Sequence, residues 1–341
     1  MARLLHRVNH KFNKGGVMKY KELVIAVAKV TLHYKYLWFF GLFAAFLSNG
    51  GLYQSITGSS SSSLTPDWTK LKETGIFDWS IVSQVVAFAQ ADPLGLWWRL
   101  SVLAVILILG LFILWLAVVA QGGLINNIAK INLGKRTDFK DGVASGRANL
   151  WPVFFFKLIE KIILVAVISL SWLSILDALN YANNFWLRSL YTLIIALIII
   201  LTAALALGVR YSLTYAVIKG ARFIEALGAG FSLLVKNWLV SLESGVIIFI
   251  LNFLLGSIIL TLISALTIPF IFLMFVFYKL ALAWGMTITL TLGVIILFVL
   301  VAVAGGALAT FNDAFWVTVW LKIAREKQAS WLGSIFSRQK S

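Results

Sequence analysis

The sequence contains no cysteine and only three histidines, at His6, His10 and His33. The absence of cysteine excludes a disulfide framework, a thiol nucleophile, a thiolate metal site and a haem-attachment motif. Three histidines near one end of the chain offer little for a histidine-based metal centre. We therefore expect neither a cofactor nor a bound metal.

Charge is also scarce, because 12% of the residues are charged and 61% are hydrophobic. Soluble domains have about a quarter of their residues charged. Several apolar stretches reach the roughly 20 residues that a helix needs to cross the hydrocarbon core of a bilayer. The short alternating strands of a membrane barrel are missing. The sequence therefore predicts an all-α integral membrane protein.

We place six transmembrane helices, arranged as three hairpins. Their predicted ranges are 36–54, 97–121, 153–176, 188–211, 244–264 and 287–320. The stretch from Ser264 to Met286 is apolar apart from Lys279 and contains Pro269. We interpret it as an outer-leaflet or re-entrant connector, since a seventh span would place the basic C-terminal tail outside.

The formal net charge of +16 is distributed unevenly. Lys and Arg gather at the N-terminus, in 121–161, in 210–243 and at the C-terminus; the exceptions are Lys70, Lys72, Arg99, Arg188 and Lys279. This is the positive-inside pattern. It predicts a multi-pass protein of the bacterial cytoplasmic membrane with both termini in the cytoplasm. The partners that it favours are anionic membrane lipids, not nucleic acid.

Three similar segments precede the predicted hairpins. They begin at Tyr20, Phe139 and Phe223, and each has a carboxylate two residues later, small residues in the middle, and a basic residue and tryptophan at the end. Such a segment is typical of an interfacial helix. The pattern predicts pseudo-repeats at about 18–135, 136–218 and 219–325, with chance resemblance as the alternative. A further interfacial helix is expected at Asp78–Gln90.

The two ends of the chain lie outside this membrane domain of residues 18–325. Lys14-Gly15-Gly16 precedes Met18 and can be encoded by a ribosome-binding sequence. We therefore hypothesise that Met18 is the true start, and that residues 1–17 are translated upstream sequence or a disordered basic segment. A genuine basic amphipathic arm is the alternative. Residues 326–341 form a basic cytoplasmic tail.

Ionisable residues close to or within the spans are the candidate site residues, since burying them is costly. Lys157, Glu160 and Lys161 lie in the third span, and Glu160 can neutralise Lys157 one turn away. Two interpretations stand: snorkelling with structural ion pairs, or a polar, headgroup-sized pocket among the three hairpins. The remaining candidates for contact with a headgroup or pocket are Arg147, Trp151, Arg210, Glu243 and Asp313.

No complete catalytic motif occurs. The stretch Asp138–Arg147 resembles the start of the CDP-alcohol phosphotransferase signature, but Ser145 and Gly146 stand where that signature has Ala-Arg. The chain then enters the apolar run 150–154, and the further glycine and metal-binding aspartates of the signature are missing. An incomplete set of aspartates cannot hold the divalent metal ion that this signature binds. We therefore expect a protein that is not an enzyme.

The openings YKELVIAVAKVTLHYKYLWFFGL and FKDGVASGRANLWPVFFFKLI resemble the polytopic membrane domain attached to some bacterial glycerophosphoryl diester phosphodiesterases. The resemblance implies a membrane module. The catalytic barrel of that family has no counterpart, so hydrolase activity is not implied. We expect a non-enzymatic protein that organises lipid or partner proteins, with a transporter or flippase for a small amphiphile as the alternative.

Overall fold

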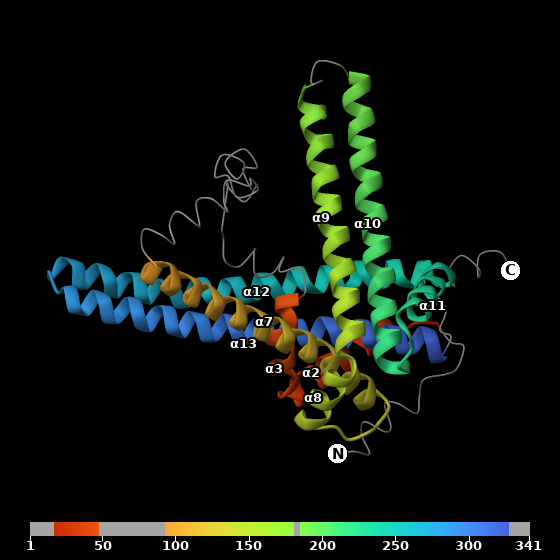
Figure 1. The fold of residues 1–341 in the computed structure, drawn as a ribbon, viewed down its shortest axis with the longest axis horizontal. Helices are drawn as coiled ribbons and strands as arrows, with labels where there is room; N and C mark the ends of the chain where they lie inside the picture. Colours follow the sequence, from red (N-terminus) through yellow and green to blue (C-terminus); the bar gives the residue numbers. More distant parts are fainter. Residues whose placement is uncertain (1–16, 48–92, 181–184, 327–341) are drawn as a thin grey trace. The chain divides into compact units, whose positions relative to one another are not determined.

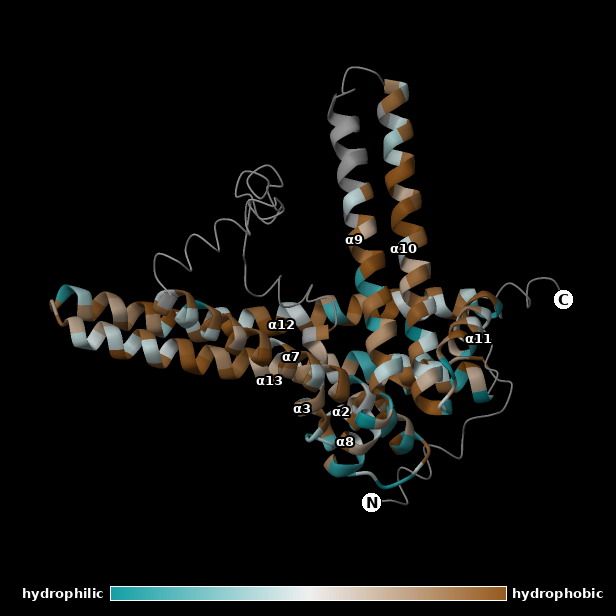
Figure 2. Ribbon diagram, viewed as in Figure 1, coloured by the Kyte–Doolittle hydropathy of each residue, from teal (hydrophilic) through white to brown (hydrophobic). Residues whose placement is uncertain are grey.

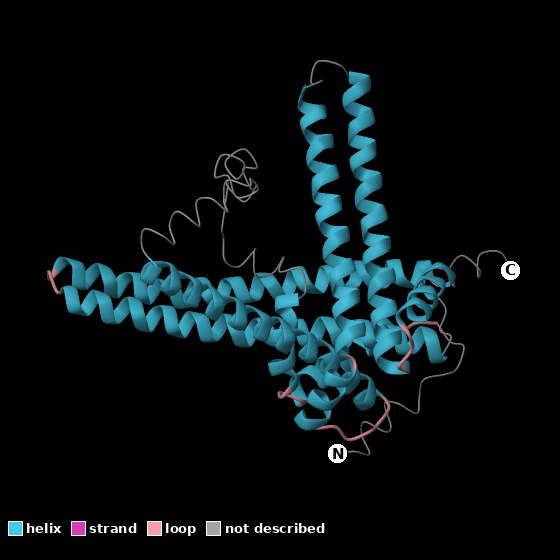
Figure 3. Ribbon diagram, in the orientation of Figure 1, coloured by secondary structure: helices cyan, strands magenta, loops and turns pink. Residues whose placement is uncertain are grey.

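The protein consists of helices joined by short turns and loops in the part of the chain that the computed structural model describes, which is residues 17–47, 93–180 and 185–326 (Figure 1; Figure 3). The helices are α2 (Tyr20–His33), α3 (Leu37–Leu47), α7 (Pro93–Asn132), α8 (Phe139–Ala148), α9 (Leu150–Asn180), α10 (Phe185–Lys219), α11 (Phe223–Lys236), α12 (Trp238–Lys279) and α13 (Ala283–Glu326). The chain forms two compact units, Gly50–Leu116 and the remainder. Each is described by itself, and the second holds the site below.

Four helices are long and apolar enough to cross a membrane, namely α7, α10, α12 and α13. A fifth span is counted when α2 and the start of α3, which meet at a bend of 102°, are taken together. The prediction of a helical, multi-pass membrane protein is therefore confirmed in its coarse form. The arrangement as six spans in three hairpins stays a prediction.

Three short helices begin at the residues that the sequence singles out. They are α2, α8 and α11, and each buries the residues three and seven positions after its first one: Leu23 and Val27, Gly142 and Gly146, Ala226 and Gly230. A spacing of four residues places each pair on one face of a helix. The start of α8 is fixed by a capping box, in which the backbone N–H of Asp141 donates to the Asp138 carboxylate at 2.9 Å.

Asparagine marks the break after two of these helices. Asn149 follows α8, and its side-chain amide donates to the carbonyl of Ser145 at 2.9 Å. Asn237 follows α11 and donates in the same way to the carbonyl of Leu233 at 3.0 Å. Each of these carbonyls also accepts the backbone N–H of the same asparagine, at 3.1 Å, so the side-chain amide adds a second hydrogen bond at the end of the helix. The chain then continues as a long apolar helix.

Each short helix packs against the end of a long helix. Helix α2 packs on α13, and α11 packs on α10. Helix α8 lies against residues 117–132 of α7 so closely that a Cβ atom on Gly146 would collide with the carbonyl group of Val119. Gly230 of α11 is equally close to Ser212 of α10. Glycine is required at both contacts because the backbones leave no room for a side chain.

The buried core lies at one end of each long helix. It includes residues 117–131 of α7, Val153 and Phe156 of α9, residues 208–217 of α10, residues 240–248 of α12 and residues 308–323 of α13. Beyond it, α10 and α12 expose most of their large apolar side chains. The exposed part of α10, residues 185–207, is about 35 Å long at 1.5 Å per residue. Figure 2 shows this apolar character along α10, α12 and α13.

The prediction of a connector at Ser264–Met286 is wrong. Helix α12 continues without a break through Pro269 to Lys279, and only Leu280–Leu282 separates it from α13. Ala281 makes this tight turn with a φ of 52°. Pro269 is tolerated because neighbouring groups can compensate for its missing N–H in an apolar helix. Gly285 and Gly293 of α13 let Phe277 and Phe270 of α12 pack closely, which holds the hairpin together.

Several sequence predictions fall outside the described residues. They are the upstream segment 1–16, the interfacial helix Asp78–Gln90 and the basic tail from 327 onward. Met18 is described, and its side chain is buried in the core. The hypothesis that Met18 is the start therefore stays a prediction.

Candidate functional site

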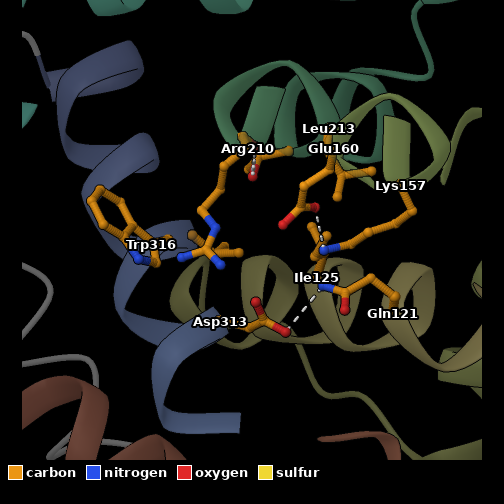
Figure 4. Close-up of a pocket in the computed structure, with 10 residues that line it drawn as sticks. Gln121, Ile125, Lys157, Glu160, Arg210, Leu213, Asp313 and Trp316 are labelled. Carbon is orange, nitrogen blue, oxygen red and sulfur yellow. Dashed lines mark hydrogen bonds and ion pairs between the residues drawn. The ribbon is translucent and has the colours of Figure 1, made fainter. Parts of the chain in front are cut away.

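Four helices bring polar side chains together at the edge of the buried core (Figure 4). Lys157 and Glu160 come from α9, Arg210 from α10, Asp313 from α13 and Gln121 from α7. Four of these five residues are predicted candidates from three separate stretches of the chain. The structure thus places Lys157, Glu160, Arg210 and Asp313 around one cavity.

Two direct contacts hold the cluster. The ammonium group of Lys157 donates to the Glu160 carboxylate at 2.8 Å, and the exposed fractions of the two side chains are 6% and 21%. The side-chain amide of Gln121 donates to the Asp313 carboxylate at 3.0 Å. The first contact lies within α9, whereas the second joins α7 to α13. Each carboxylate therefore already has a donor from the protein.

Arg210 is positioned differently. Its guanidinium lies over the Trp316 ring, 5.5 Å from the ring centroid. Figure 4 shows the side chain extending into the space between Trp316 and the two carboxylates. Among the described residues its guanidinium donates no hydrogen bond to a protein acceptor and forms no ion pair within 4.0 Å. Its five N–H donors are therefore available to a molecule in the cavity.

The cavity itself is small, about 10 Å³, which is room for about one water molecule. Leu213, Val317 and Ile125 line it beside the polar groups, and in this conformation it is too small for a headgroup. The expectation of a headgroup-sized pocket therefore stays a prediction. A larger ligand can enter only if the pairs described above separate.

The chemistry of the cluster is ionic. It contains two cationic and two carboxylate side chains, so its formal charge is zero with all four ionised. Within the described residues no group of three or more His, Asp or Glu side chains is placed to hold a metal ion. The arrangement can bind polar or charged groups through Arg210 and Lys157 on one side and the carboxylates on the other.

The other predicted residues lie elsewhere. Arg147 is exposed on α8. Trp151 is 65% exposed at the start of α9 and stacks on Phe155. Lys161 is half-buried on α9 and does not line the cavity. Glu243 of α12 is buried and accepts a hydrogen bond from the Tyr20 hydroxyl, which connects α12 to α2.

Sequence reasoning missed Gln121 and Trp316. A neutral amide or an aromatic ring inside an apolar run carries little signal by itself. A usable signal lies in the spacing to lysine, because Gln121, Arg210 and Asp313 each precede a lysine by nine residues. Those lysines are Lys130, Lys219 and Lys322.

Comparison of the chain with protein-family models, with curated proteins and with solved structures finds no match.

Proposed function

We propose that the chain is a non-enzymatic, multi-pass protein of the bacterial cytoplasmic membrane that organises anionic lipid at the cytoplasmic face. The observation that carries the proposal is the repeated surface at the end of the short helices. There an exposed basic residue precedes a tryptophan at the start of the next helix: Lys35 and Trp38, Arg147 and Trp151, Lys236 and Trp238. Tryptophan prefers the headgroup level of a bilayer, and each basic residue near an anionic surface contributes about 1 kcal/mol.

The burial pattern supports this position in the membrane. The exposed part of α10 is about as long as the roughly 30 Å hydrocarbon core is thick. The packed end of the molecule carries the short helices. With the exposed segments in the hydrocarbon, the three basic–tryptophan pairs lie near one membrane surface. The positive-inside distribution of Lys and Arg supports a cytoplasmic position for that surface.

The test is the lipid that co-purifies in mild detergent. We expect Arg147→Ala combined with Trp151→Leu to reduce retained anionic lipid severalfold, since 1 kcal/mol corresponds to about a fivefold change in affinity. The matched control is Lys279→Ala with Trp284→Leu, an exposed basic–tryptophan pair at the α12–α13 turn. Equal loss in both variants, or loss in neither, would contradict a lipid-binding surface at the short helices.

A transporter or flippase for a small amphiphile is the second candidate. The ionic cluster favours it, because ionisable groups next to membrane segments mark transport pathways in many proteins. The cluster lies at the edge of the packed core and not midway along the exposed helices, where transporters usually bind substrate. Accelerated movement of a labelled lipid across proteoliposomes, abolished by Asp313→Asn, would favour transport over organisation.

A further inference from the structure

The cavity is lined by matching positions of three helices. Each of α7, α10 and α13 contributes the polar residue nine positions before its lysine, together with the residue four positions after that polar one. The first set is Gln121, Arg210 and Asp313, and the second is Ile125, Thr214 and Val317. Residues four apart share a face of a helix. The same face of all three helices is therefore directed at the cavity.

The packing of the short helices has the same threefold character. Helix α8 packs on α7, the helix before it, and α11 packs on α10, the helix before it. Helix α2 begins the described chain and packs on α13, the last helix. In each case a short helix packs on the long helix before it, when the order of the helices is taken as cyclic and α13 is counted as preceding α2. The cavity lies where these three long helices meet.

The cluster also lies at the border between packed and exposed helix. On α9, Lys157 is buried and the next residue, Leu158, is 44% exposed. On α10, burial begins at Gly208, two residues before Arg210. An amphiphile with its chain along the exposed apolar segments would bring its polar end to this border.

Charge balance then selects the kind of polar end. The cluster is formally neutral, with two cations and two carboxylates. A ligand of one sign would leave an unpaired charge in a poorly solvated site, which is costly. A zwitterion can replace the internal pairs and leave the net charge unchanged. Its anionic part suits the planar donor fork of Arg210, which matches phosphate oxygens, and its cationic part suits Glu160 and Asp313.

We propose that this cluster binds a zwitterionic headgroup that carries a phosphate and an ammonium group. Arg210 and Lys157 bind the phosphate, and Glu160 and Asp313 bind the ammonium. Lys157–Glu160 and Gln121–Asp313 are the contacts that separate when the headgroup enters. The site rests on the proposed membrane setting but not on the anionic-lipid surface of the short helices, so the two can be tested apart.

The experiment measures thermal unfolding of the detergent-purified full chain with added phosphatidylethanolamine, with added phosphatidylglycerol, or with glycerophosphoethanolamine, which is the zwitterionic headgroup without acyl chains. We expect phosphatidylethanolamine to raise the Tm at a concentration at least tenfold lower than phosphatidylglycerol does. Arg210→Gln should abolish this preference. Arg222→Gln, which removes an exposed arginine at the start of α11, should retain it.

Two further variants keep the test independent of folding defects. Arg210→Gln with Asp313→Asn leaves the cluster neutral and similar in shape, and it should fold yet show no preference for the zwitterion. Asp313→Asn alone makes the cluster positive and should shift the preference toward phosphatidylglycerol, which a purely structural role would not do. A response to glycerophosphoethanolamine equal to that of the lipid would identify a soluble zwitterion as the ligand.

The proposal is overturned if the wild-type protein responds equally to both lipids, or if Arg210→Gln keeps the preference. If the wild-type protein does not prefer phosphatidylethanolamine but the Arg147/Trp151 variant retains less anionic lipid, the proposed function stands and this site is absent. A protein with the zwitterion preference and no effect of that variant would have this site without the anionic-lipid surface.

Discussion

Two lysine–glutamate pairs with the same spacing show how burial decides the energetics of a residue. Lys157–Glu160 and Lys19–Glu22 are both i,i+3 pairs, at 2.8 Å and 3.3 Å between nitrogen and oxygen. The exposed fractions of the side chains are 6% and 21% in the first pair, and 72% and 50% in the second. Exposed pairs contribute at most about 1 kcal/mol, whereas removal of one partner from a buried pair costs about 3 kcal/mol or more.

The first prediction compares these pairs directly. Glu160→Gln should lower the free energy of unfolding by about 3 kcal/mol, because it leaves the Lys157 charge buried beside Arg210. Glu22→Gln should change it by less than about 1 kcal/mol. Adding Lys157→Met to Glu160→Gln should recover much of the loss. Thermal unfolding in detergent measures all three, and equal effects at positions 22 and 160 would mean that the buried pair is solvated.

Four of the five charged or amide residues around the cavity could be predicted from the sequence, because charges close to apolar runs are conspicuous. Gln121 could not, since a single amide is compatible with any helix. The cavity size could not be predicted either. It depends on how Leu213, Val317 and Ile125 pack between four helices, and periodicity carries no information on that packing.

At the scale of elements, the short helices depend on close backbone approach. Gly146 of α8 contacts the backbone of α7, whereas Gly228 of α11 has no atom within 4 Å of the position that a Cβ would take. Both glycines lie inside helices, where alanine is intrinsically favoured by about 1 kcal/mol. At Gly146 the close contact with α7 therefore outweighs helix propensity. At Gly228 no such contact exists among the described residues, and helix propensity alone decides.

The second prediction follows from this difference. Gly228→Ala should raise the midpoint of thermal unfolding slightly, by helix propensity alone. Gly146→Ala should lower it despite the same gain, because the methyl group displaces α8 from α7. A stabilised Gly146→Ala protein would show that α8 does not pack tightly in the membrane-embedded state.

The third prediction concerns the turn between α12 and α13. Ala281 has a φ of 52°, a region where a Cβ atom costs about 1 kcal/mol and glycine is free of that cost. Ala281→Gly should therefore raise stability by about 1 kcal/mol. Ala204→Gly, at an exposed position within α10, should lower it by about the same amount. Thermal unfolding of the two variants should thus shift in opposite directions.

The starts of the short helices were predictable because an aromatic residue and a carboxylate recur at the same spacing. The course of Ser264–Met286 was not. Taken by themselves, Pro269 and Lys279 indicate that the apolar helix is interrupted there. The chain nevertheless stays helical up to the turn, because α13 offers small residues at Gly285 and Gly293 against which α12 packs.

For the whole molecule, the absence of cysteine makes topology directly measurable, since each introduced thiol is the only one. The charge distribution predicts that Ser61→Cys and Leu280→Cys react with an impermeant thiol reagent from outside the cell. Ser334→Cys should react only after permeabilisation. Labelling of Ser334→Cys in intact cells would mean an odd number of spans and would reverse the assignment of the C-terminus.

The three matched positions Gln121, Arg210 and Asp313 have a consequence for how such a site can arise. A symmetric trimer of identical subunits places the same residue three times around its axis, so three arginines or three aspartates would repel one another in a poorly solvated space. An amide, a cation and an anion can occupy equivalent positions only when each is encoded separately. Encoding the three positions separately in one chain therefore permits a neutral, charge-paired centre.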